Sequence, residues 1–224
     1  MIASYMDSTN LKPEATSEDI VKLCDDAVRL KMAAVCVNPS RLELAAAVLN
    51  HSQVNKCTVI GFPLGAERTA VKYYNARESL LTGADELDMV INVGALKDGN
   101  YSLIEKEIEQ LNQLKRDFRF ILKVIVETAL LNEKELEIIT KIISDTGADY
   151  IKTSTGFSSR GASLKDIDII NRYKSKDLKI KASGGIRTLE ACLGFIEAGV
   201  NRVGSSNAGL IVEEYRNRGG LLGR

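Results

Sequence analysis

The chain has 224 residues, of which 30 are Lys or Arg, 30 are Asp or Glu and one is His. Zero formal net charge argues against nucleic acid or an anionic membrane as a partner, because long-range attraction to polyanions needs a surplus of basic residues. The single His51 argues against a histidine-ligated catalytic metal and against Ser-His or Cys-His catalysis. We expect neither a metal nor a cofactor.

We find neither a targeting signal nor a closely spaced pair of cysteines in the sequence. No apolar run approaches the ~18 residues of a membrane helix, and the polar Met1–Asp7 segment is too short for a signal peptide. The four cysteines form no C-x-x-C pair, so we expect small buried apolar side chains rather than a zinc ribbon or a redox couple. These features together predict a soluble, cytoplasmic protein.

The first clear elements are a helix and a strand. Thr16 and Asp19 form a capping-box-like pair ahead of apolar residues at helical spacing, which predicts an amphipathic helix. The continuously apolar segment Ala33–Val37 ends at Asn38 and Pro39, which is typical of a strand buried on both faces. The same alternation continues to the end of the chain.

Counting a short first strand, the pattern predicts eight strands, at Ser4–Asp7, Ala33–Val37, Cys57–Phe62, Glu86–Asn92, Phe120–Glu127, Asp149–Thr155, Lys179–Ser183 and Asn201–Gly204. Between the later strands lie helical patterns near residues 67–82, 102–116, 132–146, 163–175 and 188–198. Caps are expected at Ser102, Asn132 and Ser163, each followed three residues later by an acidic residue.

Alternating strands and helices predict a parallel sheet, and eight units of about 28 residues fit a (β/α)8 barrel. An open doubly wound sheet is the alternative. No Pro/Ser-rich linker divides the chain, so residues 1–224 are interpreted as a single barrel domain. The fingerprints G-x-G-x-x-G and G-x-x-x-x-G-K-[ST] are absent, which argues against dinucleotide and P-loop nucleotide sites.

Four successive strands each contain an ionisable residue embedded in apolar neighbours: Asp88, Lys123, Lys152 and Lys181. For any one of them taken alone, a structural ion pair without a catalytic role is the alternative interpretation. Four on neighbouring strands are expected to converge at one end of the barrel. A buried amine beside a second ammonium group loses its proton more easily and can then attack a carbonyl, so the pattern predicts Schiff-base chemistry with Asp88 moving protons. Spacing alone does not identify the nucleophilic lysine.

The last two strands end in glycine-rich turns, which contain Gly184 and Gly185 in one case and Gly204 and Ser205 in the other. For either turn taken alone, a tight turn that binds no ligand is the alternative interpretation. Because barrels commonly hold a phosphate on the backbone amides after strands seven and eight, the two turns together predict a phosphate site. Thr155 and Gly156, after the sixth strand, are expected to add donors from the adjacent loop.

At these residues the sequence resembles the deoxyribose-phosphate aldolase family over almost its whole length. The matching segments are Asp7–Thr16, Ala34–Pro39, Gly61–Gly65, Glu86–Asn92, Lys123–Thr128, Ile151–Phe157 and Lys181–Thr188. The pair of motifs Lys-Thr-Ser-Thr-Gly and Lys-Ala-Ser-Gly-Gly-Ile-Arg-Thr is highly specific.

The resemblance implies a metal-independent class I aldolase that reversibly cleaves 2-deoxy-D-ribose 5-phosphate to D-glyceraldehyde 3-phosphate and acetaldehyde. It implies that Lys152 forms the Schiff base, that Lys181 is the second lysine that makes this amine reactive, and that Asp88 donates and accepts protons. The substrate-binding positions it implies are Asp7, Thr9, Cys36, Lys123, Thr155, Gly156, Gly184, Gly185, Gly204 and Ser205, with Cys36 open to attack by aldehydes.

Three positions depart from the family pattern. Phe157 stands where some relatives have a lysine that reaches the phosphate, so the phosphate is expected to rely more on loop amides. Ser8 stands where many relatives have His, and the run from Gly204 to Ala208 differs modestly from the family's usual Gly-(Thr or Ala)-Ser-Ser run.

Two other functions stay open, a Schiff-base barrel aldolase for another phosphosugar or keto acid, and a non-catalytic phosphosugar-binding barrel. A homo-oligomer, dimer or tetramer, is expected from the apolar surface that barrel helices commonly expose. The terminal segment Arg216–Arg224 has no predicted role.

Overall fold

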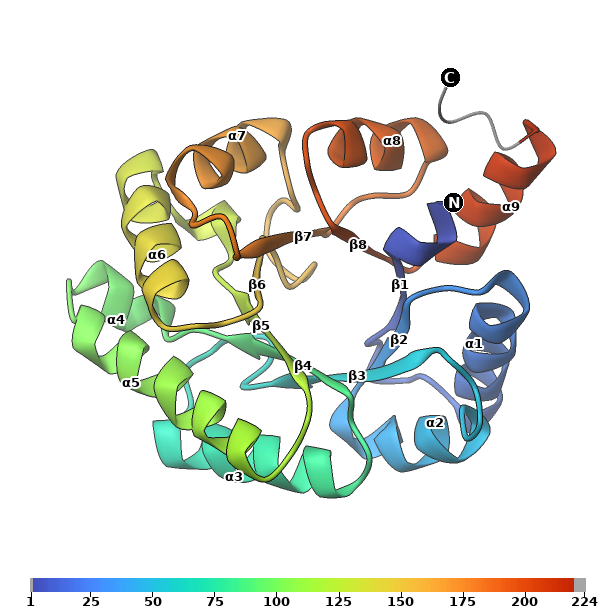
Figure 1. The fold of residues 1–224 in the computed structure, drawn as a ribbon, viewed down its shortest axis with the longest axis horizontal. Coiled ribbons are helices and arrows are strands. Elements are labelled where there is room, and N and C mark those ends of the chain that lie inside the picture. Colours follow the sequence, from blue (N-terminus) through green and yellow to red (C-terminus); the bar gives the residue numbers. More distant parts are fainter. Residues whose placement is uncertain (1, 220–224) are drawn as a thin grey trace.

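The computed structural model describes residues 2–219 and contains a closed barrel of eight parallel strands in chain order, surrounded by helices (Figure 1). The strands are β1 (Met6–Asn10), β2 (Ala34–Val37), β3 (Asn55–Ile60), β4 (Glu86–Val90), β5 (Ile121–Ile125), β6 (Tyr150–Lys152), β7 (Lys179–Ser183) and β8 (Arg202–Ser205). Pairing of β8 with β1 closes the ring. The (β/α)8 prediction is confirmed, and the open doubly wound alternative is excluded.

The α-helices form the outer layer of the barrel (Figure 1). They are α1 (Ser17–Leu30), α2 (Leu42–Val48), α3 (Thr69–Leu81), α4 (Val93–Lys97), α5 (Tyr101–Gln113), α6 (Glu133–Asp145), α7 (Leu164–Tyr173), α8 (Leu189–Glu197) and α9 (Ala208–Asn217). Full capping boxes begin α1, α6 and α7 at Thr16, Asn132 and Ser163, as predicted.

Several boundaries differ from the prediction. The first strand was expected at Ser4–Asp7 but begins at Met6, because Ile2–Tyr5 forms a 3-10 helix. Ser102 does not cap α5: Asn100 does, and its side chain accepts a hydrogen bond from the backbone N–H of Leu103. The strand β6 ends at Lys152, so the residues that follow are free to form a loop at the barrel mouth.

The sequence pattern gave no bounds for three helices, α2, α4 and α9, although it indicated a helical stretch ahead of His51, where α2 lies. Two of them are short, at seven and five residues, and short amphipathic segments give little periodicity. The third, α9, includes Arg216, whose guanidinium donates to the backbone oxygen of Leu30. Arg218, which follows the helix as its C-cap, pairs with Glu190 and Glu214. The rest of the segment without a predicted role, residues 220–224, lies outside the described residues.

Apolar side chains form two clusters. The larger one fills the space between the strands and the helices, with fully buried residues such as Ile20, Leu87 and Ile139. The smaller one contains Ala34 and Cys36 from β2, Cys57 and Val59 from β3, and Leu11, which follows β1. Phe62 packs against this cluster. The remaining strands leave room for polar groups inside the barrel, and this is where the ionisable residues lie.

A buried ion pair supports the carboxyl end of β4. Lys72 on α3 donates to Glu107 Oε1 on α5 at 2.8 Å and to the backbone oxygen of Val90 at 2.9 Å. The second Glu107 oxygen accepts from the backbone N–H of Asn92 at 3.1 Å. Both charged side chains are fully buried. Two helices are thereby fixed to the end of the strand that carries Asp88.

The remaining expectations concern isolated residues. The four cysteines are free and buried, as predicted. His51 is exposed in a turn that follows α2. Within residues 2–219, none of the helices is both long and apolar enough to cross a lipid bilayer.

Candidate active site

Asp88, at the middle of β4, is the centre of a buried hydrogen-bond network. Its Oδ1 accepts from the ammonium group of Lys123 at 2.7 Å and from the Cys57 thiol at 3.2 Å. Its Oδ2 accepts from Lys152 at 2.8 Å and from Lys181 at 2.7 Å. The predicted convergence of Asp88 with the three lysines is therefore present, and the structure pairs Asp88 with all three of them.

Strand register brings these lysines together. Asp88 lies opposite Lys123 in the β4–β5 pairing, and Lys152 lies opposite Lys181 in the β6–β7 pairing. Paired positions of parallel strands lie side by side, so in-register residues that face the barrel interior meet there. Lys152 and Lys181 therefore share one oxygen of the Asp88 carboxylate, which is fully buried.

A second set of charges lies beneath the first. Lys123 also contacts Glu86, at 2.5 Å, and Lys181 contacts Asp7, at 2.5 Å. Arg202, the first residue of β8, contacts both of these carboxylates, at 2.5 Å each. The sequence analysis did not identify Glu86 and Arg202. Glu86 could have been found from its position two residues before Asp88, which places both on the same face of β4.

The charged forms of these groups are favoured by their partners. Burial by itself would raise the pKa of Asp88, but Lys123, Lys152 and Lys181 outweigh it and hold this pKa well below its ordinary value. Burial by itself would lower the pKa of Lys181, but Asp7 and Asp88 raise it. Lys181 therefore stays positively charged at neutral pH, directly beside Lys152.

Two thiols complete the buried cluster. Cys36 and Cys57 are in register on β2 and β3, and their sulfur atoms lie within 4.8 Å of each other and of Asp88. Burial raises the pKa of Cys57 well above its usual value, and a hydrogen bond from Cys57 lowers that of Cys36. This group could supply three metal ligands, but both Asp88 oxygens already accept from ammonium groups, which repel a cation.

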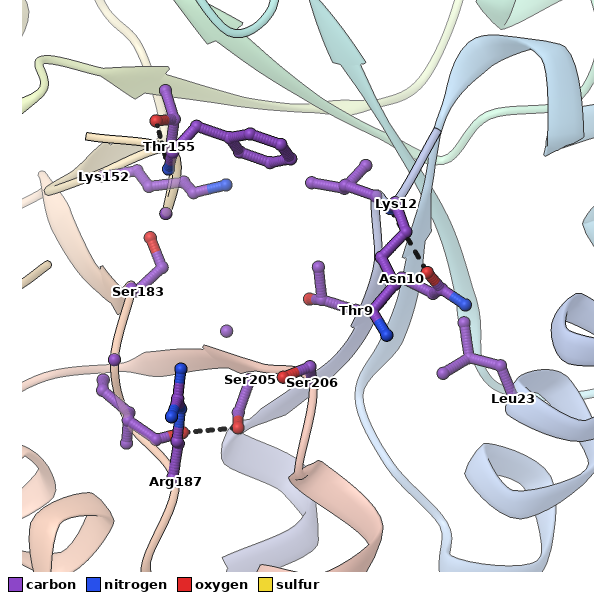
Figure 2. A pocket seen from close by; sticks show the side chains of 17 residues that line it. Thr9, Asn10, Lys12, Leu23, Lys152, Thr155, Ser183, Arg187, Ser205 and Ser206 are labelled. Atoms are coloured by element: carbon purple, nitrogen blue, oxygen red, sulfur yellow. Dashed lines mark hydrogen bonds between the residues drawn. The ribbon is translucent and has the colours of Figure 1, made fainter. Parts of the chain in front are cut away.

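Above the charges a pocket of about 360 Å³ opens at the carboxyl ends of the strands (Figure 2). The predicted site residues that line it are Thr9, Lys152, Thr155, Gly156, Gly184, Gly185, Gly204 and Ser205. The other predicted residues, Asp7, Cys36, Asp88, Lys123 and Lys181, are buried and are not among its lining residues. Lys152 thus joins the two sets, since it contacts Asp88 and its amine points into the pocket (Figure 2).

The two glycine-rich turns bring backbone close to the pocket. Gly184 has a φ of +85°, and a Cβ there would lie 2.8 Å from the Cα of Gly161, so only glycine fits without a shift of the backbone. A Cβ at Gly204 would lie 3.2 Å from the Cε of Lys181. The Ser205 hydroxyl donates to the backbone oxygen of Ile186 at 2.6 Å, which ties the two turns together.

Sequence reasoning missed two cations at the pocket rim, Lys12 and Arg187. They lie on opposite sides of the pocket, with Ser206 between them (Figure 2). Within residues 2–219, neither cation has a carboxylate within ion-pair distance. Arg187 lies in the motif Lys181–Thr188, but the direction of its side chain depends on the loop conformation.

The loop after β6 forms another part of the wall. Glu127 accepts a hydrogen bond from the backbone N–H of Thr155 at 3.1 Å and another from the Thr155 hydroxyl, so the end of β5 fixes this loop. Phe157 follows and packs edge-on against Phe62, with 5.3 Å between the ring centroids. Its side chain lines the pocket and gives this wall an apolar surface.

The closed barrel, with buried amines that lead into a polar pocket at the strand ends, defines a (β/α)8-barrel enzyme. Residues 1–224 match the family model described as DeoC/LacD family aldolase. The chain belongs to this aldolase family. The resemblance identified from the sequence is confirmed.

Curated relatives match the chain over nearly its whole length. The deoxyribose-phosphate aldolase of Thermococcus gammatolerans is 48% identical over 218 residues, which are 96% of this chain and 97% of that one. The enzyme of the same name from Staphylococcus carnosus is 44% identical over 211 residues, 94% of this chain and 95% of that one.

Solved structures have the same fold. The aldolase QR15 superposes with a TM-score of 0.93 at 39% identity, covering 99% of both chains. The tetrameric deoxyribose phosphate aldolase from Aeropyrum pernix superposes with a TM-score of 0.89 at 29% identity, covering 97% of this chain and 92% of that one.

Proposed function

We propose that this aldolase is a deoxyribose-phosphate aldolase, which reversibly cleaves 2-deoxy-D-ribose 5-phosphate to D-glyceraldehyde 3-phosphate and acetaldehyde through a Schiff base. The observation that carries the proposal is the position of Lys152. Of the three lysines around Asp88, it is the one that lines the pocket. The curated relatives at 44–48% identity bear this name and support the choice of substrate.

Lys152 is the nucleophile in this proposal. Its amine attacks C1 of the open-chain sugar, and loss of water gives a protonated imine. The C3 hydroxyl then loses its proton, the C2–C3 bond breaks, and its electrons pass into the imine to give an enamine. Glyceraldehyde 3-phosphate leaves, C2 of the enamine is protonated, and water hydrolyses the resulting imine to free acetaldehyde and Lys152.

The neighbours of Lys152 have distinct roles. The positive charge of Lys181 disfavours a second ammonium group beside it, which makes the amine of Lys152 available. Asp88 accepts from both lysines, so it is in place to move the protons of dehydration and enamine formation, directly or through one water. Lys123 holds the other Asp88 oxygen and keeps the carboxylate in position.

The phosphate subsite lies in the turns after β7 and β8. Backbone amides of Gly184, Gly185 and Ser205 supply donors there. We assign Arg187 and Lys12 as the cations that flank the phosphate, because they line opposite sides of the pocket without a carboxylate partner within residues 2–219. They supply the positive charge that a lysine provides in some relatives, at the position that Phe157 occupies in this chain.

Borohydride trapping tests the proposal. Acetaldehyde and sodium borohydride are added to the protein, and peptides are mapped by mass spectrometry. An ethyl group at Lys152, its loss in Lys152→Ala, and its retention in the exposed control Lys176→Ala support the mechanism. Absence of any adduct on the folded protein would refute the Schiff base and favour a phosphosugar-binding barrel.

A second assay separates deoxyribose-phosphate aldolase from other Schiff-base aldolases. Purified protein is incubated with acetaldehyde, a keto acid or another small carbonyl donor, each with glyceraldehyde 3-phosphate as acceptor. The proposal expects acetaldehyde to be the preferred donor. Preference for a keto acid would retain the Lys152 chemistry but replace the substrate.

We also propose a homo-oligomer, dimer or tetramer, that acts in the cytoplasm as one barrel domain. Large apolar side chains are exposed on the helices, among them Tyr74 and Leu210, and the relative from Aeropyrum pernix is described as tetrameric. Four free cysteines suit a reducing compartment. Light scattering after size exclusion measures the assembly, and a monomer at micromolar concentration would refute it.

A further inference from the structure

Arg202 occupies a position that the proposed reaction does not explain. Its guanidinium spans Asp7 and Glu86 at 2.5 Å each, and the residue is only 7% exposed. It is not among the residues that line the pocket, so it does not touch the substrate. A buried arginine carries a permanent charge, because its guanidinium does not lose its proton in proteins.

The barrel interior holds more potential cations than anions. The cations are Lys123, Lys152, Lys181 and Arg202, and the carboxylates are Asp7, Glu86 and Asp88. With every group ionised, the interior carries one excess positive charge. An unbalanced charge away from water is unfavourable, so release of one proton stabilises the cluster.

Most members of the cluster are held in their charged forms. Burial would raise the pKa of Asp7 and lower those of Lys123 and Arg202, but in each case the opposite charges around the group reverse the shift. Glu86 contacts both Lys123 and Arg202 directly. These groups therefore do not supply the proton.

Lys152 is the member that is free to release it. Lys123 contacts three carboxylates, and Lys181 contacts two. Among the carboxylates of residues 2–219, Lys152 contacts only that of Asp88, at the oxygen that it shares with Lys181. Because Lys152 also lines the pocket, its proton has a path to water.

We propose that Arg202 is a positioning residue whose fixed charge, held on Asp7 and Glu86, drives Lys152 to give up its proton. This inference rests on the proposed role of Lys152 as the nucleophile. Arg202, Lys123 and Lys181 together supply three positive charges, which balance Asp7, Glu86 and Asp88 without an ammonium group at Lys152. Without Arg202, the three carboxylates balance three lysines, and Lys152 retains its proton.

Other titratable groups also face this cluster. Cys36 on β2 and Cys57 on β3 lie beside Asp88, and Tyr150 on β6 interacts with Arg202. The charge count treats both thiols as neutral. A Cys36→Ser background, in which no thiolate can form at that position, holds this variable fixed in the experiment.

The test compares variants that change the charge count by one. Arg202→Met removes a positive charge, Arg202→Lys retains it, and Arg202→Met/Glu86→Gln removes one charge of each sign. The primary measurement is the rate of reductive methylation at Lys152 by formaldehyde and cyanoborohydride, followed by peptide mass spectrometry from pH 5 to pH 10. This reports the free amine whatever substrate the enzyme uses, and the pH profile of turnover is measured alongside it.

We expect the labelling profile of Arg202→Met to move to higher pH by about one unit, which is a roughly tenfold slower reaction on its acid side. A unit charge about 10 Å away at an effective dielectric constant of about 20 has an effect of this size. Arg202→Lys should label like the wild type, and the double variant should return toward it. Should Arg202→Met fail to fold, Glu86→Gln alone tests the same charge count. It removes one negative charge, so the labelling profile of Lys152 should move to lower pH.

A purely structural role for Arg202 gives a different result. The rate would then fall equally at every pH, and the charge-balanced double variant would not restore the profile. Either outcome would overturn the inference. If the labelling shifts as expected but the wild type does not cleave 2-deoxyribose 5-phosphate, the inference stands and the proposed substrate fails.

Discussion

The buried pair of Lys72 and Glu107 predicts a large and specific loss of stability. Lys72→Met removes the ammonium group and retains an unbranched apolar chain that adapts to the space. Glu107 then retains only its hydrogen bond from the backbone N–H of Asn92, and the backbone oxygen of Val90 loses its donor. Both side chains are fully buried, so water does not replace the missing contacts.

The size of the effect follows from this burial. Removal of one partner of a buried ion pair typically costs about 3 to 5 kcal/mol. In a protein of this length, each 1 kcal/mol lowers the melting temperature by about 2 to 4 °C, so we expect a decrease of about 6 to 20 °C. Burial already raises the pKa of Glu107 with Lys72 present. In the variant Glu107 therefore takes up a proton more readily, which limits the cost at low pH.

Urea unfolding at neutral pH measures the free energy of unfolding, with an unchanged m-value as the check that the variant unfolds in the same way. Lys72→Met/Glu107→Gln should recover much of the loss, because the orphaned charge is gone. Lys176→Met, at an exposed position, is the matched control and should change stability by less than about 0.5 kcal/mol. A Lys72→Met protein within about 1 kcal/mol of the wild type would refute the reasoning.

Three further predictions concern the site. Asp88→Asn should reduce turnover by about 10² to 10⁴, since the proton carrier is lost while the shape is kept, and near-normal turnover would contradict that role. Arg187→Ala should raise KM for 2-deoxyribose 5-phosphate by about tenfold or more and leave cleavage of unphosphorylated 2-deoxyribose unchanged; equal effects on both would remove Arg187 from the phosphate subsite. The pKa values of Asp7 and Asp88 lie below 3.8 in the folded protein, so their stabilising contribution is complete above pH 3.8 and is lost as pH falls through the folded values. Urea midpoints measured between pH 5 and pH 2 should therefore fall, and less steeply in Asp88→Asn.

Much of the architecture was available in the sequence because it depends on local patterns. Capping residues such as Thr16 and Asn132 and short apolar runs such as Ala33–Val37 located helices and strands without knowledge of their neighbours. The predicted boundaries of helices and strands were less accurate where a segment adopts another local conformation. The residues before Met6 form a 3-10 helix rather than a strand, and the short helices α2 and α4 have too few turns to reveal a period.

The core of the candidate site was predicted for a similar reason. A charged residue among apolar strand residues is conspicuous, so Asp88, Lys123, Lys152 and Lys181 were each visible from their immediate neighbours. Arg202 begins its strand and Glu86 begins another, and charges at strand ends commonly reach solvent. Sequence alone therefore gave no reason to expect Arg202 inside the barrel, whereas the two-residue spacing of Glu86 from Asp88 was a usable signal.

The sequence by itself determined the alternating elements, the glycine-rich turns and the chemical types that meet inside the barrel. Only the tertiary structure decided which lysine opens into the pocket, which carboxylate each lysine contacts, and that Lys12 and Arg187 flank the same space. The physical reason is that pairing between strands and closure of β8 onto β1 set the register. Contacts across the barrel depend on that register, which no single segment of the chain contains.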